Sequence, residues 1–230
     1  MTVYAFIFAR GGSKEIKNKN IKLFKGKPLI SYSINIAKDS NEIDQVFVST
    51  DSKKIIKVSK NYGARIIKRP TSLSRDNSLE IDAWKHAVKY IHSNGLRPKF
   101  FVSLPCTAPL RIKKDISLAL KKIKSNKDLV VGLADSVKSP YYNIVELKSN
   151  KKVKPVISKN FYTSRQKVKK TYDMTTIIYA CRFDLISKLK KSIWEANIKY
   201  IKIPINRAID IDNKLDFKIA EYLYKYLVKR

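Results

Sequence analysis

The fold of this chain is indicated by the stretch Ala5-Phe6-Ile7-Phe8-Ala9-Arg10-Gly11-Gly12-Ser13-Lys14, which Lys19-Asn20 follows. An apolar run of strand length leads directly into an arginine, two glycines, a serine and a lysine. Glycines let successive backbone N–H groups turn toward one point, and Arg10 and Lys14 place positive charge beside them. Nucleotide-binding α/β domains carry such a turn after their first strand. The stretch therefore predicts an α/β domain whose first turn binds phosphate groups.

The rest of the chain alternates short β-rich runs with helical patterns, which is typical of βαβ units around a parallel sheet covered on both faces. We expect strands at residues 3–8, 45–49, 64–68, 100–104, 128–133, 175–181 and 200–203. We expect helices at residues 28–38, 53–62, 79–93, 112–124, from 183 onward, and 214–229. Residues 139–170 break this rhythm, and the alternation at 143–147 predicts a hairpin. The chain is thus expected to be one domain with an arm.

Composition limits the class of protein. A length of 230 residues with 44% hydrophobic residues suits one large globular domain. No apolar run reaches the roughly 20 residues that span a bilayer, and the start lacks the layout of a secretion signal. Cys106 and Cys181 form no disulfide framework or metal motif, and both lie in apolar surroundings. We therefore expect a cytoplasmic protein without membrane insertion, whose cysteines are buried.

The net charge of +30 raises a nucleic-acid-binding module as an alternative. The excess is almost all lysine, spread along the whole chain and mixed with isoleucine and asparagine. The chain has only ten arginines, the residues that read bases most often. We therefore expect no dedicated nucleic-acid partner, whereas a general preference for anionic substrates agrees with the charge.

Four further polar clusters follow the expected strands, where open α/β sheets bind ligands. They are Arg69-Pro70 with Asp76 and Ser78; Pro105-Cys106-Thr107-Ala108-Pro109-Leu110-Arg111; Arg165-Gln166 ahead of Tyr172-Asp173-Met174-Thr175-Thr176; and Ile209-Asp210-Ile211-Asp212. The carboxylates of Asp210 and Asp212, at positions i and i+2, can bracket a hard divalent cation that also bridges phosphate oxygens. Singly, each cluster also has an ordinary explanation: Asp212 could cap the last helix, and Arg69 could be an exposed loop charge.

Together these segments resemble the acylneuraminate cytidylyltransferase family, the enzymes that make CMP-sialic acid and related CMP-nonulosonates. The family's opening motif I-P-A-R-G-G-S-K-G-I…K-N-I corresponds to residues 7–16 and 19–21. Its S-T-D, R-P…L-A-x-D, T-S-P-L-R and D-I-D segments correspond to residues 49–51, 69–76, 107–111 and 210–212. These matches run in order through nearly the whole chain.

The resemblance implies a Rossmann-like three-layer α/β/α nucleotidyltransferase fold with a mostly parallel sheet. It also implies a protruding arm, at about residues 139–171, through which a homodimer forms. The implied reaction is attack of the anomeric hydroxyl of a 2-keto acid sugar on the α-phosphate of CTP, with release of pyrophosphate. Such a transfer depends on charge neutralisation and in-line positioning more than on covalent help.

Residue roles follow from the same resemblance. The catalytic residues implied are Arg165, Lys14 and Arg10. The nucleotide-binding residues implied are Arg10, Gly11, Gly12, Ser13, Lys14, Asn20, Arg69 and Ser78. The sugar-binding residues implied are Gln166, Tyr172, Thr175 and Thr176. Asp210 and Asp212 are implied to hold Mg²⁺.

Several positions depart from the family's pattern. Glu15 replaces the usual glycine after the lysine, Glu80 stands where some members have a nucleotide-contacting arginine, and Pro105 stands where many have glutamine. The segment 173–176 replaces the common E-N-G-A/S segment near the sugar. Cytidylyl transfer is therefore predicted more firmly than the sugar. A sialic acid relative, an octulosonate of the CMP-Kdo type and another sugar nucleotide of the same fold all remain alternatives.

Overall fold

The computed structural model describes residues 2–149, 151–158 and 167–227. Its strands are β1 Val3–Phe8, β2 Leu23–Phe24, β3 Lys27–Pro28, β4 Gln45–Thr50, β5 Arg65–Lys68, β6 Phe100–Ser103, β7 Asp128–Asp135, β8 Val145–Leu147, β9 Val153–Pro155, β10 Tyr172–Arg182 and β11 Asn197–Lys202. Its α-helices are α1 Leu29–Lys38, α2 Lys53–Asn61, α3 Glu80–Ser93, α4 Lys113–Lys122, α5 Leu185–Lys188 and α6 Lys214–Leu227.

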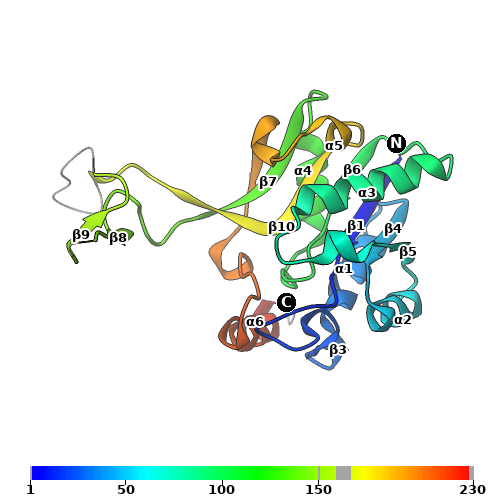
Figure 1. Cartoon of the computed structure of the whole chain (residues 1–230), viewed down its shortest axis with the longest axis horizontal. Coiled ribbons are helices and arrows are strands. Elements are labelled where there is room, and N and C mark those ends of the chain that lie inside the picture. The colour runs from blue at the N-terminus through cyan, green and yellow to red at the C-terminus, as the bar shows by residue number, and fades with distance from the viewer. Residues whose placement is uncertain (1, 150, 159–166, 228–230) are drawn as a thin grey trace.

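A seven-stranded sheet in the order β11-β7-β10-β6-β1-β4-β5 forms the centre of the molecule (Figure 1). The strands β1, β4, β5 and β6 pair in parallel, as do β7 and β11, whereas β10 runs antiparallel to both of its neighbours. The sheet is thus mostly parallel, and the carboxyl ends of β1, β4, β5 and β6 share one edge. The expectation of a Rossmann-like α/β fold with a mostly parallel sheet is confirmed.

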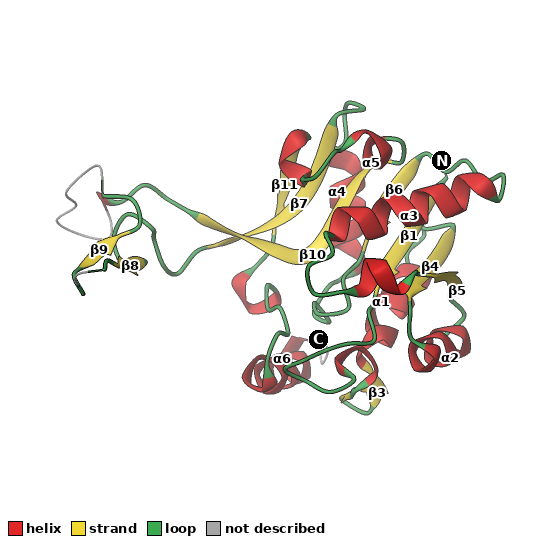
Figure 2. Ribbon diagram, viewed as in Figure 1, coloured by secondary structure: helices red, strands yellow, loops and turns green. Residues whose placement is uncertain are grey.

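Helices cover both faces of this sheet (Figure 2), as the side-chain alternation requires. On one face, β1 contributes Val3, Ala5 and Ile7 to a core shared with α1, α2 and α4. On the other, Tyr4 and Phe6 pack with α3 and α5. The second core is aromatic: the Phe6 ring stacks on Phe101 with centroids 4.7 Å apart. A smaller cluster anchors α6 beside β2.

Several elements differ in length from the expectation. The helix expected from residue 183 is a single turn, α5, because Leu189 ends it in an extended conformation. Strands β7 and β10 are longer than expected and pair out to Tyr172 and Asp135, beyond the body of the domain. This two-stranded ribbon carries the arm, which projects from the body and includes the hairpin β8–β9 (Figure 1). The expected hairpin is therefore confirmed.

Both cysteines are buried and free, as expected. Among the described residues, no helix combines the length and the apolar character needed to cross a membrane.

Candidate active site

A cleft of about 520 Å³ opens beside the loop that follows β1. Its walls come from that loop, the segment after β5, the start of α3, and the ends of the segments that follow β6 and β11. The lining residues are Phe8, Arg10, Ser13, Lys14, Glu15, Ile16, Lys19, Asn20, Arg69, Leu73, Arg75, Asp76, Ser78, Leu79, Glu80, Ala83, Thr107 and Asp212. The structure thus gathers most of the expected nucleotide-binding residues, together with one expected metal ligand, around one cavity.

Side chains from two other segments hold the backbone of the glycine loop in place. The Gly11 N–H donates to Asp51 Oδ1 at 3.0 Å, and the Asn20 amide donates to the Arg10 carbonyl at 3.0 Å. A Cβ on Gly11 would lie 3.1 Å from Ser52 Cβ, a spacing tighter than most real contacts. Glycine is therefore favoured at position 11 by the close approach of the segment after β4. The loop therefore has a defined backbone conformation.

Two cations of the loop are paired with one carboxylate. Asp76 lies 2.7 Å from an Arg10 guanidinium nitrogen and 2.5 Å from Lys14 Nζ. The contacts with Lys14 and Arg10 lower the pKa of Asp76. All three side chains are accessible to solvent, so the pairs are exchangeable. Asp76 belongs to a quoted motif, but its role as counter-ion was missed because nothing in the sequence brings it next to the loop.

Arg69 lies in the cleft as a buried cation whose donors are not used. Its backbone N–H donates to the Thr50 carbonyl at 2.9 Å, which fixes the residue behind the end of β4. The side chain is 9% exposed, and its Nε and Nη2 atoms have no hydrogen-bond partner among the described residues. Desolvation by burial lowers the Arg69 pKa. Unpaired buried donors are costly, so Arg69 is prepared for an acceptor that the protein does not supply.

The carboxylate pair differs in exposure. Asp212 lines the cleft and accepts a 3.4 Å contact from Lys19 Nζ, which also donates to the Ile211 carbonyl at 2.7 Å. The Asp210 Oδ1 atom is buried without a partner in the described part of the chain. Desolvation raises the Asp210 pKa, and the charge of Asp212 adds to this rise, while the hydroxyls of Thr107 and Thr176 oppose it.

An irregularity in β10 lies beside this pair, where the Thr176 hydroxyl interacts with Asp210. The β10–β7 register moves from Thr175↔Gly132 to Tyr179↔Val131, so residues 176–178 bulge out of the ladder. Bulges of this kind re-aim side chains next to active sites. No local pattern predicts the bulge, because residues 175–179 form an unbroken run of β-branched and aromatic residues.

Arg111 stabilises the bulge through hydrogen bonds from its guanidinium group. Its guanidinium donates to the carbonyls of Ile177, Thr176 and Pro105 and to the Ser33 hydroxyl, with the Pro105 and Ser33 bonds at 2.9 and 3.0 Å. The residue is 5% exposed, and burial lowers its pKa to about 10. The sequence places Arg111 in a motif but does not predict its hydrogen bonds to the bulge, because these join segments far apart in the chain.

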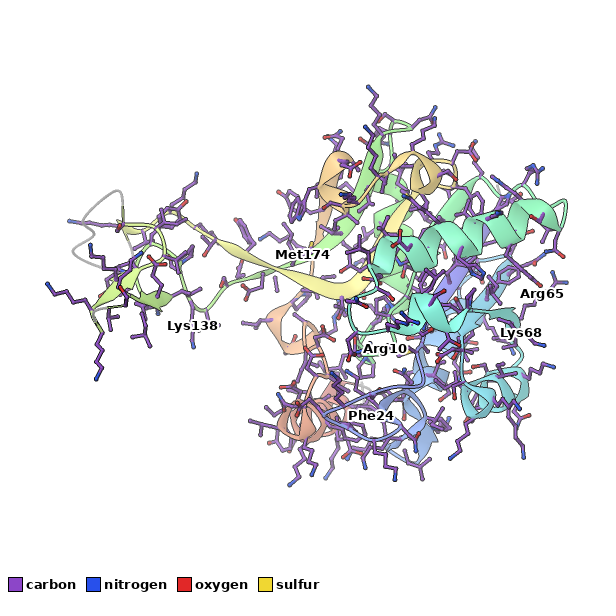
Figure 3. The ribbon with its side chains drawn as sticks, in the orientation of Figure 1. Arg10, Phe24, Arg65, Lys68, Lys138 and Met174 are labelled. Atoms are coloured by element: carbon purple, nitrogen blue, oxygen red, sulfur yellow. The ribbon has the colours of Figure 1, made fainter. Side chains whose placement is uncertain are left out.

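Of the remaining expected site residues, those that the structure describes lie on β10. Thr175 is 4% exposed, and the buried hydroxyls of Thr175 and Thr176 make no hydrogen bond of normal geometry within the described ranges. Tyr172 is exposed on the ribbon, where Lys202 Nζ lies 3.4 Å from its ring centroid. Arg165 and Gln166 lie outside the described residues. Figure 3 shows Arg10 on the body of the molecule, Met174 on the ribbon and Lys138 further out toward the arm.

No cluster of three or more His, Cys, Asp or Glu side chains suited to a metal ion occurs in the ranges that the structure describes. Asp210 and Asp212 form a pair only. Mg²⁺ in nucleotide sites commonly takes one or two carboxylates, with phosphate oxygens and water as its other ligands.

The sheet, the glycine loop and the cleft at the strand ends together define a nucleotidyltransferase of the Rossmann-like α/β class. A family model described as cytidylyltransferase matches residues 4–190. The post-translational flagellin modification protein B of Campylobacter coli is 35% identical and covers 95% of this chain and 93% of its own length. The CMP-N,N'-diacetyllegionaminic acid synthase of Campylobacter jejuni is 33% identical and covers 94% of this chain and 92% of its own length. The chain belongs to the cytidylyltransferase family.

A solved CMP:2-keto-3-deoxy-manno-octonic acid synthetase, in complex with CTP, superposes with a TM-score of 0.70 and covers 98% of this chain and 99% of its own. Its sequence identity is 16%, so this likeness shows the shared fold.

Proposed function

We propose that this enzyme transfers CMP from CTP to the anomeric hydroxyl of a nine-carbon 2-keto acid sugar, a sialic acid-like nonulosonate, and releases pyrophosphate. The observation that carries the proposal is the cleft itself, which combines a cationic glycine loop with the unpaired donors of Arg69. The acceptor class is supported by the relative named as a CMP-diacetyllegionaminic acid synthase, which matches over almost the full length of both chains.

The triphosphate is assigned to the loop between residues 10 and 14. Backbone N–H groups of Gly11, Gly12 and Ser13 would receive phosphate oxygens, while Arg10 and Lys14 offset the charge that builds on the leaving pyrophosphate. Asn20 keeps the loop in shape through its bond to the Arg10 carbonyl. Ser78 lies in the same cleft, where its hydroxyl now donates to the Ser72 carbonyl at 2.9 Å.

Asp210 and Asp212 fit a magnesium ion. The buried, unpartnered Oδ1 of Asp210 is a hard oxygen in need of a partner, and Asp212 faces the cleft. When bound, Mg²⁺ would neutralise phosphate charge and orient the α-phosphate for in-line attack. Lys19, through its contacts with Ile211 and Asp212, holds this segment against the cleft.

In the transfer, the anomeric oxygen of the sugar forms a bond to the α-phosphorus, and the bond from that phosphorus to the bridging oxygen breaks. The sugar hydroxyl gives its proton to water, and pyrophosphate leaves with the bridging oxygen. This chain's residues position and neutralise rather than form a covalent intermediate. We assign Thr175 and Thr176, with Tyr172, Arg165 and Gln166, to the sugar side of the reaction on the resemblance alone.

We also propose a homodimer formed through the arm, in a cytoplasmic enzyme. The arm exposes apolar side chains that a partner would cover. These are Val137, Tyr142, Ile144, Val145, Leu147, Val153 and Val156. Sedimentation or light scattering of the whole chain, compared with a variant carrying Leu147→Asp and Val153→Asp, tests this part separately.

The decisive assay incubates the enzyme with CTP, Mg²⁺ and a panel of 2-keto acid sugars, including eight-carbon octulosonate, and measures pyrophosphate release. We expect release with a nonulosonate. The variant Asp212→Asn should lose metal-dependent turnover while its circular dichroism stays unchanged. Release with the octulosonate only would change the acceptor. No release with any sugar, together with tight and salt-sensitive binding of DNA or RNA, would overturn the proposal.

A further inference from the structure

The cleft presents two kinds of surface to a ligand. Arg10, Lys14 and Lys19 give it positive charge, which suits phosphate groups. Phe8, Leu79 and Ala83 give it apolar contact, which suits the flat face of a ring. A nucleotide has both of these parts, so the two surfaces together match its shape and charge.

Two carboxylates that line the cleft, those of Glu15 and Glu80, have no assigned part in binding phosphate or metal; Glu15 directly follows the glycine loop, whereas Glu80 lies apart from it in the chain. Glu80 is the first residue of α3, and its side chain faces the cavity and stays accessible to solvent through it. Phosphate groups would be repelled by it, because both are negative. If the phosphates lie on Arg10 and Lys14, Glu80 must face an uncharged part of the nucleotide.

Glu80 and Arg69 act as a pair of opposite hydrogen-bonding character. Arg69 offers donors only, through the unpartnered Nε and Nη2 atoms, whereas an ionised carboxylate only accepts. Desolvation by burial raises the pKa of Glu80, and the charge of Asp210 adds to this rise. The Trp84 indole and the Arg69 charge oppose it. The cleft therefore carries donors and an acceptor within one electrostatic neighbourhood.

This pairing matches the edge of cytosine. Cytosine offers an amino group at C4, which donates, and acceptors at N3 and O2. Uracil carries a carbonyl oxygen at C4 instead, which a carboxylate would repel. Carboxylates are the side chains that accept from the cytosine amino group in known nucleic-acid contacts.

We propose that Glu80 accepts the exocyclic amino group of cytosine and, with Arg69 donating to the same base, makes this cleft select CTP over UTP. This inference rests on the proposed function, because it takes the cleft as the nucleotide site. It gives a positive role to a residue at which this chain departs from the family pattern.

The experiment measures dissociation constants of CTP and UTP in the presence of Mg²⁺ by titration calorimetry, so no acceptor sugar is needed. We expect the unmodified enzyme to favour CTP by roughly tenfold or more, the range of one good base contact. In Glu80→Gln, the amide can turn to accept from cytosine or donate to uracil. The preference should then fall to within about threefold, mainly through tighter UTP binding.

The matched control is Asp82→Asn, which removes a carboxylate from the same first turn of α3 but does not line the cleft. Its preference for CTP should equal that of the unmodified enzyme. An unchanged CTP preference in Glu80→Gln, or an equal loss of both nucleotides as a ribose contact would give, overturns the inference. Failure of the unmodified enzyme to bind either nucleotide overturns the proposed function instead, and this inference with it.

Discussion

Arg10 and Asp76 form an ion pair of 2.7 Å across the mouth of the cleft, and Lys14 joins the same carboxylate from the glycine loop. The two cations assigned to the triphosphate thus share one internal carboxylate, which offsets one of their two positive charges. A triphosphate must displace Asp76 before it can use them. Asp76 therefore competes with the substrate for its own binding groups.

The variant Asp76→Asn should bind inorganic pyrophosphate and CTP more tightly, by about two- to fivefold, since exposed ion pairs are individually weak. The gain should shrink as salt concentration rises, because salt screens such pairs. Calorimetric titration with pyrophosphate at two ionic strengths measures both effects. Asp39→Asn, an exposed carboxylate at the end of α1, is the control for net charge. Weaker binding in Asp76→Asn would mean that Asp76 orients the two cations for the phosphates.

Arg69→Met should separate stability from function. Because the guanidinium is buried with unpartnered donors, its removal relieves a desolvation cost, and the variant should melt at the same or a higher temperature. CTP binding should weaken by about tenfold or more, since a hydrogen bond to a charged group is lost. Thermal melting with and without CTP reports both quantities. A fall in melting temperature with unchanged CTP affinity would show that Arg69 is structural only.

Arg111→Met should destabilise the fold by about 3 kcal/mol or more, because several buried acceptors lose their donor at once. Urea unfolding monitored by tryptophan fluorescence measures this loss. Arg65→Met is the control, since Arg65 makes its 2.7 Å bond to Gln45 on the exposed edge and should cost about 1 kcal/mol or less. Equal losses in the two variants would contradict the assigned role of Arg111.

The two cysteines should resist thiol reagents in the folded protein. Burial raises the pKa of Cys106 to about 12 and also raises that of Cys181, so both remain protonated and enclosed at pH 8. Reaction with a chromogenic disulfide should therefore be slow until urea is added. In the unfolded chain these thiols ionise near their ordinary pKa of about 8.5. Their contribution to stability is thus present below that pH and declines as pH rises toward the folded values. Rapid labelling of the native protein at pH 8 would contradict this.

The sequence predicted the layered architecture because local patterns carry it. The apolar run of β1 and the strand-helix alternation are local features, and most strands of the central sheet and most helices occur where they were expected. The antiparallel direction of β10 depends on the route of the long arm back to the sheet, which no local pattern encodes. The same holds for the single turn of α5.

The residues of the candidate site divide in the same way, into those that local motifs predict and those that only the structure shows. Arg10, Lys14 and Arg69 could be found because they stand in motifs, and the cleft brings them together. The Asp76 ion pairs, the β10 bulge and the Arg111 contacts join segments far apart in the chain, so they needed the structure. Residues 165 and 166 remain predictions.

The ribbon of β7 and β10 has a geometric consequence for how such an arm can change. Side chains alternate between faces with a period of two residues, so a paired insertion of two residues in each strand lengthens the ribbon and preserves which side chains face which way. A single insertion would turn the outer hairpin over. The bulge lies nearer the body than the ribbon's outer pairs, at Thr175 to Tyr179, so such changes leave it untouched. The length of the ribbon can therefore change by two residues in each strand without altering the bulge next to the body.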